Sequence, residues 1–374
     1  MDDLLDLNTT VSDVAQAHME VDFFSKKKKM PLNESKCILM IINSKPPHPQ
    51  PVLTMNNGIM NIEEETKYLG DMFNAKGNNE ALIKDRTAKA IRCLVGCFSE
   101  CHAVTMGCKA INSLLLLYKT VYLPTIIFNC EAWDSITKSE WEKLQVLQMK
   151  FLKRALQVPT STPNALVLLE LGLLPIEFEI KSRQLTFLHH ILTREEDDPV
   201  KICYLQQKCF HFEENWANQM ERTLKQMDIG ENTEEIAKLS SGEWKGLVKR
   251  QVKKAAVDEL YNRRNTLKKG ATLEYGETLA MQPYFDKLNA NNARTFFQMR
   301  TEVLDIKSFR GYKYEDNTCR LCGSEREDLE HIVNQCPGVP RHNGLIEWIS
   351  GENMDFVRTA VRRTLYFLKI VEET

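Results

Sequence analysis

The first 75 residues combine one helical pattern with several short apolar runs. Apolar residues recur at helical spacing from Val14 to Phe24, behind Thr9 and Thr10, which offer an N-cap. This pattern predicts a helix that ends just before a proline. The run Cys37–Ile42 is apolar and rich in β-branched residues, so it predicts a buried strand. Three further short strands are predicted, the first two joined by a hairpin turn: Val52–Met55, Ile59–Ile62 and Lys67–Phe73.

The pattern becomes helical from about residue 79 to residue 196. Glu140 follows Thr137 by three residues, which is the spacing of a capping box at the start of a helix. Pro163 in the first turn and Gly172 just past the end delimit a short helix. Five helices are expected here: Ala81–Cys101, Ala110–Tyr122 (ending at Pro124), Trp141–Leu156, the short one that starts at Thr162, and Pro175–Leu192.

The rest of the chain is expected to be helical, with one loop-rich segment near its end. Residues 200–300 have a less regular helical pattern, and Lys245–Lys269 carries nine Lys or Arg residues against two acidic ones. Residues 311–345 are rich in loop-forming residues and cysteine, and Asp355–Val371 predicts a closing helix. The predicted fold class is therefore α+β, mostly α. Domain boundaries are expected near residues 75, 196 and 310.

The composition limits what the chain can do. A chain of 374 residues is long enough for two or three domains, and 43% hydrophobic residues suffice for buried cores. The formal net charge is −2 and the pI is about 6.5, so the overall charge supplies no attraction to nucleic acid. A nucleic-acid role would need local basic patches, such as Lys245–Lys269 or Lys26–Lys29. Taken alone, such runs more often form a solvated helix face.

The cysteines and the hydropathy indicate the compartment. Eleven cysteines are spread over the whole chain, and the acidic first 15 residues lack the apolar core of a signal peptide. No apolar run approaches the roughly 20 residues that span a bilayer. We therefore expect a protein of the nucleus or cytoplasm without a membrane partner, whose cysteines are buried thiols or metal ligands. Cys93, Cys97 and Cys101, four residues apart on one predicted helix, are expected to be core thiols.

The sharpest chemical signal is a set of four possible metal ligands. Cys319, Cys322, His331 and Cys336 follow one another with spacings typical of a zinc knuckle. A Cys-x-x-Cys turn presents two thiolates to one ion, and a short helical turn from His331 brings Cys336 to the same side. Four protein ligands leave no open position, so the pattern predicts a structural Zn²⁺ site.

Several short motifs also follow one another in a recognisable order. Met1-Asp2-Asp3 opens the chain, Asn33 and Lys36 form an Asn-x-x-Lys element, and Tyr68-Leu69-Gly70 follows. A helical block around Trp133 comes next, then the segment Phe296–Lys307 and the cysteine knuckle. In this order the motifs resemble the downstream part of a non-LTR (LINE-type) retrotransposon reverse transcriptase.

The resemblance implies a division of the chain and a set of site residues. Residues 1–75 would be the end of a palm, 76–196 a thumb, 197–310 a connector and 311–374 a CCHC knuckle with its closing helix. Asp2 and Asp3 match the last two residues of the family's metal-binding turn, although the aromatic residue of that turn is absent. The residues expected to contact nucleic acid, by the resemblance or by their charge, are Lys36, Tyr68, Leu69, Gly70, Lys253, Lys254, Arg263 and Arg264.

The expected function follows from what the sequence contains and what it lacks. Nucleotide transfer uses two metal ions held by carboxylates from more than one strand. The family's further aspartate and its fingers lie upstream of the Asp-Asp turn, so we expect a truncated RNA-directed DNA polymerase with an incomplete site. Mg²⁺ would bind only if that site were completed. Binding of RNA and DNA would remain. The alternatives are a zinc-stabilised helical interaction protein without nucleic-acid affinity, or an active polymerase if this sequence lacks the upstream half of its gene product or if a partner supplies the missing palm.

Overall fold

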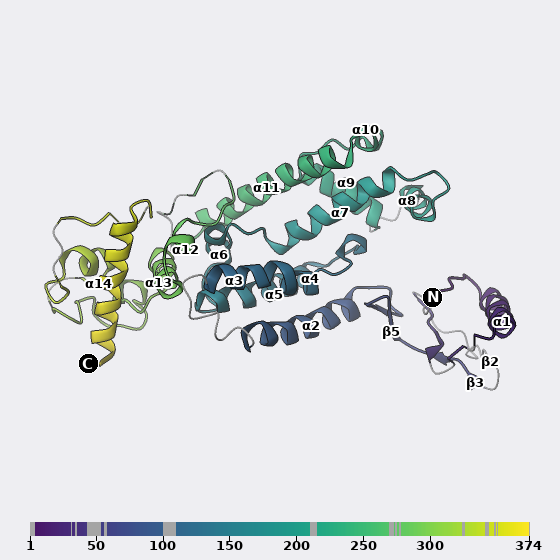
Figure 1. The fold of residues 1–374 in the computed structure, drawn as a ribbon, viewed down its shortest axis with the longest axis horizontal. Helices are drawn as coiled ribbons and strands as arrows, with labels where there is room; N and C mark the ends of the chain where they lie inside the picture. The colour runs from purple at the N-terminus through teal and green to yellow at the C-terminus, as the bar shows by residue number, and fades with distance from the viewer. Residues whose placement is uncertain are drawn as a thin grey trace. The chain divides into compact units, whose positions relative to one another are not determined.

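A computed structural model of the chain describes residues 4–30, 32–33, 36–42, 54–55, 58–99, 110–209, 215–268, 273, 275–276, 278–323, 326–340, 344–347, 349 and 351–373. The described part is mostly helical and has few strands (Figure 1), which confirms the predicted fold class at this level. It divides into two compact units. The first comprises Met1–Ala88 and Ser135–Glu140, and the second comprises Lys89–Asp134 and Trp141–Thr374. The division into palm, thumb, connector and knuckle stays a prediction.

The first unit begins with helix α1, Val11–Lys28, as the apolar spacing predicts. The Thr10 hydroxyl caps its N-terminus by accepting a hydrogen bond from the Asp13 backbone N–H, and Lys29 ends it in a left-handed conformation. Three lysines in the last turn face the negative end of the helix dipole.

The strands of the first unit form three separate two-stranded sheets in the part that the structure describes. The sheets pair β1 with β4 in parallel, and β2 with β3 and β5 with β6 antiparallel. The strands are β1 Ile38–Leu39, β2 Thr54–Met55, β3 Gly58–Ile59, β4 Asn61–Ile62, β5 Glu65–Tyr68 and β6 Asp71–Asn74.

Two strand predictions in this unit are wrong in detail. The expected buried strand Cys37–Ile42 shrinks to β1, whose two residues are only half-buried. Lys67–Phe73 is not one strand but part of a hairpin, because Leu69 and Gly70 both have positive φ (46° and 93°) and reverse the chain. The ion pair between Asp71 and the buried Arg86 anchors this hairpin to helix α2, Glu80–Ser99.

Helices α2 to α7 follow the predicted pattern closely. Their bounds are α2 Glu80–Ser99, α3 Ala110–Leu117, the π-helical turn η3 Tyr118–Tyr122, α4 Leu123–Ile126, the 3₁₀ turn η4 Cys130–Ala132, α5 Lys138–Leu156, α6 Asn164–Leu171 and α7 Ile176–Leu192. The Thr137–Glu140 capping box forms as predicted, with hydrogen bonds of 2.8 and 3.3 Å. The helix expected to end at Pro124 continues, because the π turn places this proline in the first turn of α4, where no N–H donor is needed.

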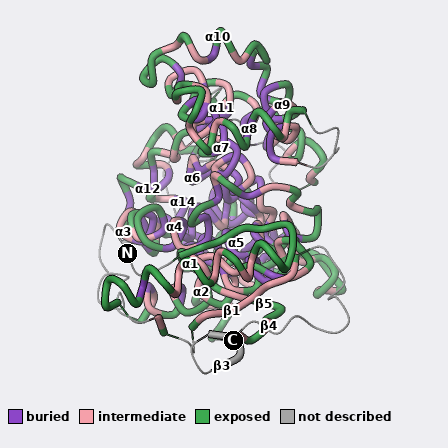
Figure 2. Tube along the Cα trace, turned by 90° about the vertical axis from the view of Figure 1, so that its right-hand side faces the viewer, coloured by how far each residue is buried: buried purple, intermediate pink, exposed green. Residues whose placement is uncertain are grey.

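Helix α7 packs against several elements of the second unit. It contacts η4 and the next four helices, α8 Pro199–Cys209, α9 Trp216–Gln226, α10 Thr233–Lys238 and α11 Ser241–Asn265. Trp244 of α11 is fully buried there, and its indole N–H donates to the Leu185 carbonyl at 2.8 Å. Buried positions gather where α7, α9 and α11 meet (Figure 2).

A buried ionic cluster joins helix α6 to the C-terminal part of the second unit. The Glu170 carboxylate accepts hydrogen bonds from Arg300 (2.8 Å), Tyr284 (2.8 Å) and Tyr275 (2.9 Å). Gly172 ends α6 with φ of +62°, and a Cβ there would lie 2.2 Å from the Met281 backbone nitrogen. The elements that follow are α12 Tyr284–Lys287, α13 Ala290–Arg300, the 3₁₀ turn η5 Lys307–Phe309, the π turn η6 His331–Gln335 and α14 Met354–Glu373.

No helix in the described ranges combines the length and the apolar character that crossing a bilayer requires.

Candidate metal centre

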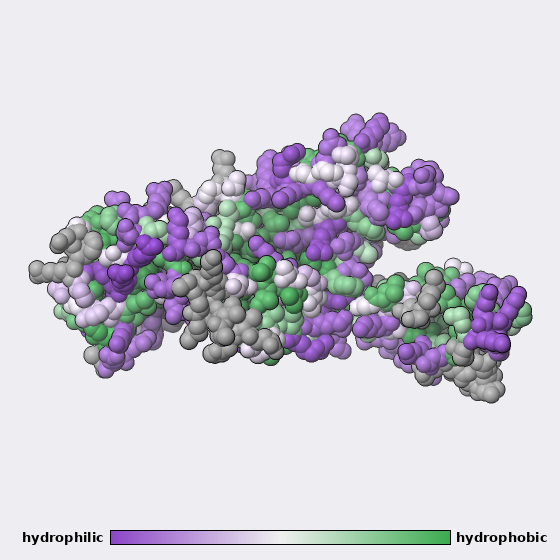
Figure 3. Space-filling view, in the orientation of Figure 1, coloured by the Kyte–Doolittle hydropathy of each residue, from purple (hydrophilic) through white to green (hydrophobic). Residues whose placement is uncertain are grey.

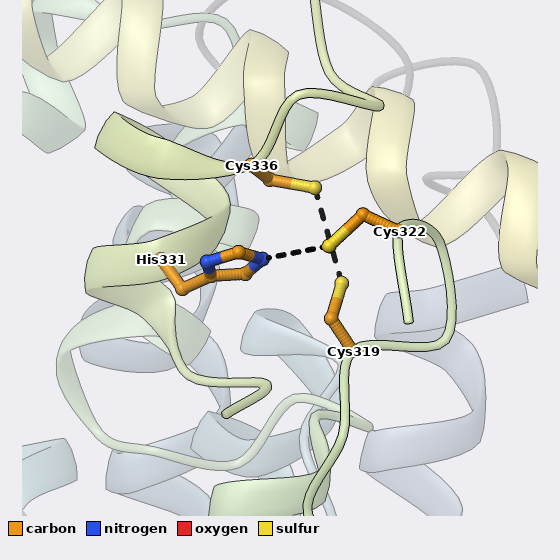
Figure 4. A group of neighbouring side chains, drawn as sticks. All are labelled: Cys319, Cys322, His331 and Cys336. Atoms are coloured by element: carbon orange, nitrogen blue, oxygen red, sulfur yellow. Dashed lines mark hydrogen bonds between the residues drawn. The ribbon is translucent and has the colours of Figure 1, made fainter. Parts of the chain in front are cut away.

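The structure brings the four predicted ligands together. One ligand atom from each of Cys319, Cys322, His331 and Cys336 lies within 4.8 Å of all the others. The Cys319 and Cys336 sulfurs are 3.9 Å apart, and the Cys322 sulfur lies 3.4 Å from His331 Nε2 (Figure 4). Three thiols and one imidazole that converge in this way can hold a metal ion.

Local backbone geometry explains the convergence. The Gly323 N–H donates to the Cys319 carbonyl at 2.8 Å, and Gly323 has φ of +71°, so the chain turns directly after the second thiol. His331 begins the π turn η6, and Asp328 caps it by accepting from the His331 backbone N–H at 2.9 Å. The Cys336 N–H donates back to the His331 carbonyl at 2.7 Å, which brings the fourth ligand to the same side.

Burial sets the electrostatics of the cluster. Cys319, His331 and Cys336 are buried and Cys322 is half-buried. Desolvation raises the pKa of the Cys336 thiol to about 12 and also raises the pKa of Cys319. Such thiols stay protonated at neutral pH unless a cation compensates the thiolate charge, and a bound divalent metal does so.

A buried ion pair between Glu327 and Arg320 supports the Cys-x-x-Cys turn. The Glu327 side chain is fully buried, and its carboxylate accepts from the Arg320 guanidinium and from the backbone N–H groups of Arg320 (2.9 Å) and Lys307 (3.0 Å). The Arg320 guanidinium also donates to the Asp305 carbonyl at 2.6 Å and to the Tyr314 hydroxyl at 3.1 Å. In the sequence, only the acidic character of the segment between Cys322 and His331 hints at this pair.

Replacing Glu327 with alanine is expected to weaken metal binding by about 10- to 100-fold. The change leaves the Arg320 charge without its counter-ion and two backbone N–H groups without their acceptor, so the backbone beside Cys319 loses its fixed position. Competition titration against a chelator measures the affinity. Glu315→Ala is the matched control, because Glu315 is an exposed residue of the same module. Equal affinities of the two variants would contradict this role of Glu327.

Helix α14 closes the module from one side. It packs against η6 and α13, and it buries Val357, Val361 and Phe367. Arg363 of α14 donates to the Pro340 carbonyl just beyond the last ligand. The neighbouring turn is also tight, because a Cβ on Gly338 would lie 2.5 Å from the Leu321 side chain. Two sets of contacts therefore hold the ligands in place. Leu321 packs against Gly338 beside the Cys-x-x-Cys turn, and α14 packs against η6, which carries His331.

The residues predicted to contact nucleic acid in the first unit are placed as follows. Lys36 is exposed, Tyr68 is half-buried, and Leu69 is exposed at the tip of the β5–β6 hairpin. The Gly70 carbonyl accepts from Arg86 at 3.2 Å. Asp2 and Asp3 lie outside the described residues.

The predicted basic residues of the second unit all lie on α11, but their surroundings differ. Arg263 pairs with Glu259, and Arg264 donates to the Leu273 carbonyl and lies 5.4 Å from the Tyr261 ring centroid. Lys253 is half-buried and Lys254 is exposed. The exposed residues Lys245, Lys249 and Arg250 extend this surface toward the start of α11.

We call these five cations of the N-terminal half of α11 the α11 ridge: Lys245, Lys249, Arg250, Lys253 and Lys254. Within the part of the chain that the structure describes, none of them has an ion-pair partner within 4.0 Å. Hydrophilic side chains cover much of the visible surface along α11 (Figure 3).

The fold and the site define a mostly helical protein with a Cys₃His cluster that can hold a metal ion. No protein-family model, no curated protein and no solved structure matches this chain.

Proposed function

We propose that this protein binds RNA or DNA through the α11 ridge and that a zinc ion stabilises its C-terminal module. The observation that carries the proposal is the ridge itself, five cations on one helix without carboxylate partners among the described residues. Affinity for nucleic acid comes largely from clustered Lys and Arg that displace counterions from phosphates. Such a local cluster acts even though the whole chain has a formal net charge of −2.

The donor set supports zinc as the ion. Three sulfurs and one imidazole nitrogen suit Zn²⁺, and a complete set of four protein ligands is typical of structural sites. None of the nine cysteines that the structure describes forms a disulfide. On this proposal the thiolate ligands stay reduced, as they would in the nucleus or cytoplasm.

The order of the sequence motifs supports an origin in a non-LTR reverse transcriptase. On this proposal the second unit corresponds to the thumb, connector and knuckle that follow the polymerase core. Asp2 and Asp3 would be the remnant of the metal-binding turn, and a carboxylate from another chain segment would be required before Mg²⁺ could serve nucleotide transfer. We therefore propose nucleic-acid binding for this chain, and nucleotide transfer only where a further carboxylate completes the metal site.

Neutralising the ridge is expected to reduce both the affinity for nucleic acid and its salt dependence. The variant changes Lys249, Arg250, Lys253 and Lys254 to glutamine. Each lost phosphate contact lowers the slope of log K against log salt by about 0.7 to 0.9, so four lost contacts lower it by roughly 3. Fluorescence anisotropy with a labelled structured RNA and a DNA duplex, at several salt concentrations, measures this slope.

A matched control distinguishes the effect of the α11 ridge from the effect of lowering the total positive charge. Lys143 and Lys150 are exposed lysines on α5, and changing both to glutamine should leave the slope unchanged. If the ridge variant binds as the wild-type chain does, the α11 ridge is not the binding surface. One zinc ion per chain without salt-dependent binding would instead identify a zinc-stabilised helical interaction protein.

A further inference from the structure

A cleft lies between helix α7 and the start of α11, beside η4. Its volume is about 430 Å³, which is within the range of small-molecule sites. Its lining includes Thr186 and Phe187 of α7 and Trp244 and Lys245 of α11. Lys245 is also the first cation of the α11 ridge, so the cleft continues the ridge at its N-terminal end.

The floor of the cleft is rigid. The His189 and Trp244 rings stack with centroids 5.8 Å apart and an interplanar angle of 16°. Both residues are buried and anchored, since His189 Nε2 lies 2.9 Å from the Leu239 carbonyl oxygen and the Trp244 indole N–H donates to Leu185. Phe187 is half-buried beside them and packs edge-on against Trp216 at 5.9 Å. The remaining exposed part of the Phe187 ring can stack with a flat ligand.

The charges at the cleft favour an anion at one end. Lys245 is exposed and has no ion-pair partner within the described ranges. Arg183 lies 3.3 Å from Glu131, and both side chains remain partly exposed. His190 is held at its Nε2 by the Arg194 guanidinium at 2.7 Å. The Lys245 end of the cleft can therefore receive a phosphate group.

Two threonine hydroxyls on the α7 wall suit a ligand group that donates a hydrogen bond. Thr186 donates its proton to the Ser182 carbonyl at 2.8 Å, and Thr193 donates its proton to the His189 carbonyl at 3.0 Å. A hydroxyl has only one proton, so both oxygens can now only accept hydrogen bonds. The positions beside these two oxygens therefore favour a ligand group that donates, such as a sugar hydroxyl, over a phosphate oxygen.

We propose that the cleft binds one ribonucleotide unit of an RNA strand that runs along the α11 ridge. The phosphate would lie at Lys245, the base would stack on Phe187, and the ribose 2′-hydroxyl would donate to Thr186. The 2′-hydroxyl is the group that distinguishes RNA from DNA. Cations at 245, 249 and 253 recur every four residues, about 6 Å along the helix, and can follow the strand away from the cleft. This inference rests on the proposed nucleic-acid binding and adds a preference for RNA.

The test compares single-stranded RNA with DNA of the same base sequence, both bound to the full chain. We expect the wild-type chain to prefer RNA, and the Thr186→Val variant to reduce that preference by about three- to tenfold, the usual effect of one hydrogen bond. Thr359→Val is the matched control, because Thr359 is also a half-buried helical threonine that donates to its own helix, at 2.8 Å. Lys245→Gln should weaken RNA and DNA equally.

A second measurement uses only the wild-type chain. RNA oligonucleotides with a 2′-deoxy sugar at one position at a time should show weaker binding at one position. Equal salt-dependent binding of RNA and DNA, with no sensitive position, would overturn the ribonucleotide site but leave the proposed function standing. Absence of binding to either nucleic acid would overturn the proposed function as well.

Discussion

Replacing Cys336 with serine is expected to abolish metal binding and to unfold the C-terminal module. The Cys336 side chain is 2% exposed, and its sulfur lies 3.9 Å from the Cys319 sulfur. A serine hydroxyl remains protonated at neutral pH, so three ligands would remain for an ion that needs four. Structural zinc contributes about 10–16 kcal/mol to the folding of zinc-finger peptides, which is as large as the total stability of a typical domain.

Zinc content and limited proteolysis test this prediction. Zinc content should fall from one ion per chain to almost none, and limited proteolysis should produce new cleavages within residues 311–373. Adding a strong chelator to the wild-type chain should produce the same cleavages. Cys203→Ser is the control, because Cys203 is an exposed thiol of α8. If Cys336→Ser retained one zinc ion and the wild-type cleavage pattern, the four residues would be a packed thiol cluster and not a metal site.

The four ligands could be predicted because they lie within 18 consecutive residues, where spacing alone fixes their geometry. The Thr137–Glu140 capping box and the end of α6 at Gly172 could likewise be predicted from residues close together in the sequence. Each of these features depends on neighbours a few residues away. The turn at Leu69 and Gly70 was missed, because a leucine at positive φ is uncommon and no local pattern announces it.

Long-range partners could not be read from the sequence. Counting charges selected Arg263 and Arg264 as contacts for nucleic acid, but the structure ties the first to Glu259 and the second to the Leu273 carbonyl. By sequence Glu327 is one acid in an acidic loop, although its fully buried carboxylate pairs with the half-buried Arg320. The sequence does not show whether a charged residue is exposed to water or forms a buried ion pair. That depends on partners that lie far away along the chain.

Glu170 is the clearest example of a buried charge whose partners are distant in the sequence. Its replacement is expected to have the largest effect on stability outside the metal centre. Its partners Tyr275, Tyr284 and Arg300 lie 105, 114 and 130 residues further along the chain. Burial alone lowers the pKa of Arg300, but the adjacent Glu170 carboxylate raises it, and the net pKa lies above the ordinary value. Burial and the Glu170 charge both raise the pKa values of the two tyrosines, so they stay neutral donors.

Glu170→Gln is therefore expected to cost about 3–5 kcal/mol, because it leaves the Arg300 charge buried without a counter-ion. Thermal unfolding followed by circular dichroism should show a midpoint lower by roughly 10 °C. Glu142→Gln is the matched control, since Glu142 is exposed on α5 and its replacement should change the midpoint little.

A double-mutant cycle tests whether the pair itself is responsible. Arg300→Met removes the buried charge, so the double variant should be more stable than the sum of the two single losses predicts, by about 1–3 kcal/mol. Strict additivity would contradict the ion pair. Arg300 would then be held mainly by its other contacts, the Ile349 carbonyl and the Phe296 ring at 5.8 Å, and Glu170 mainly by the two tyrosine hydroxyls.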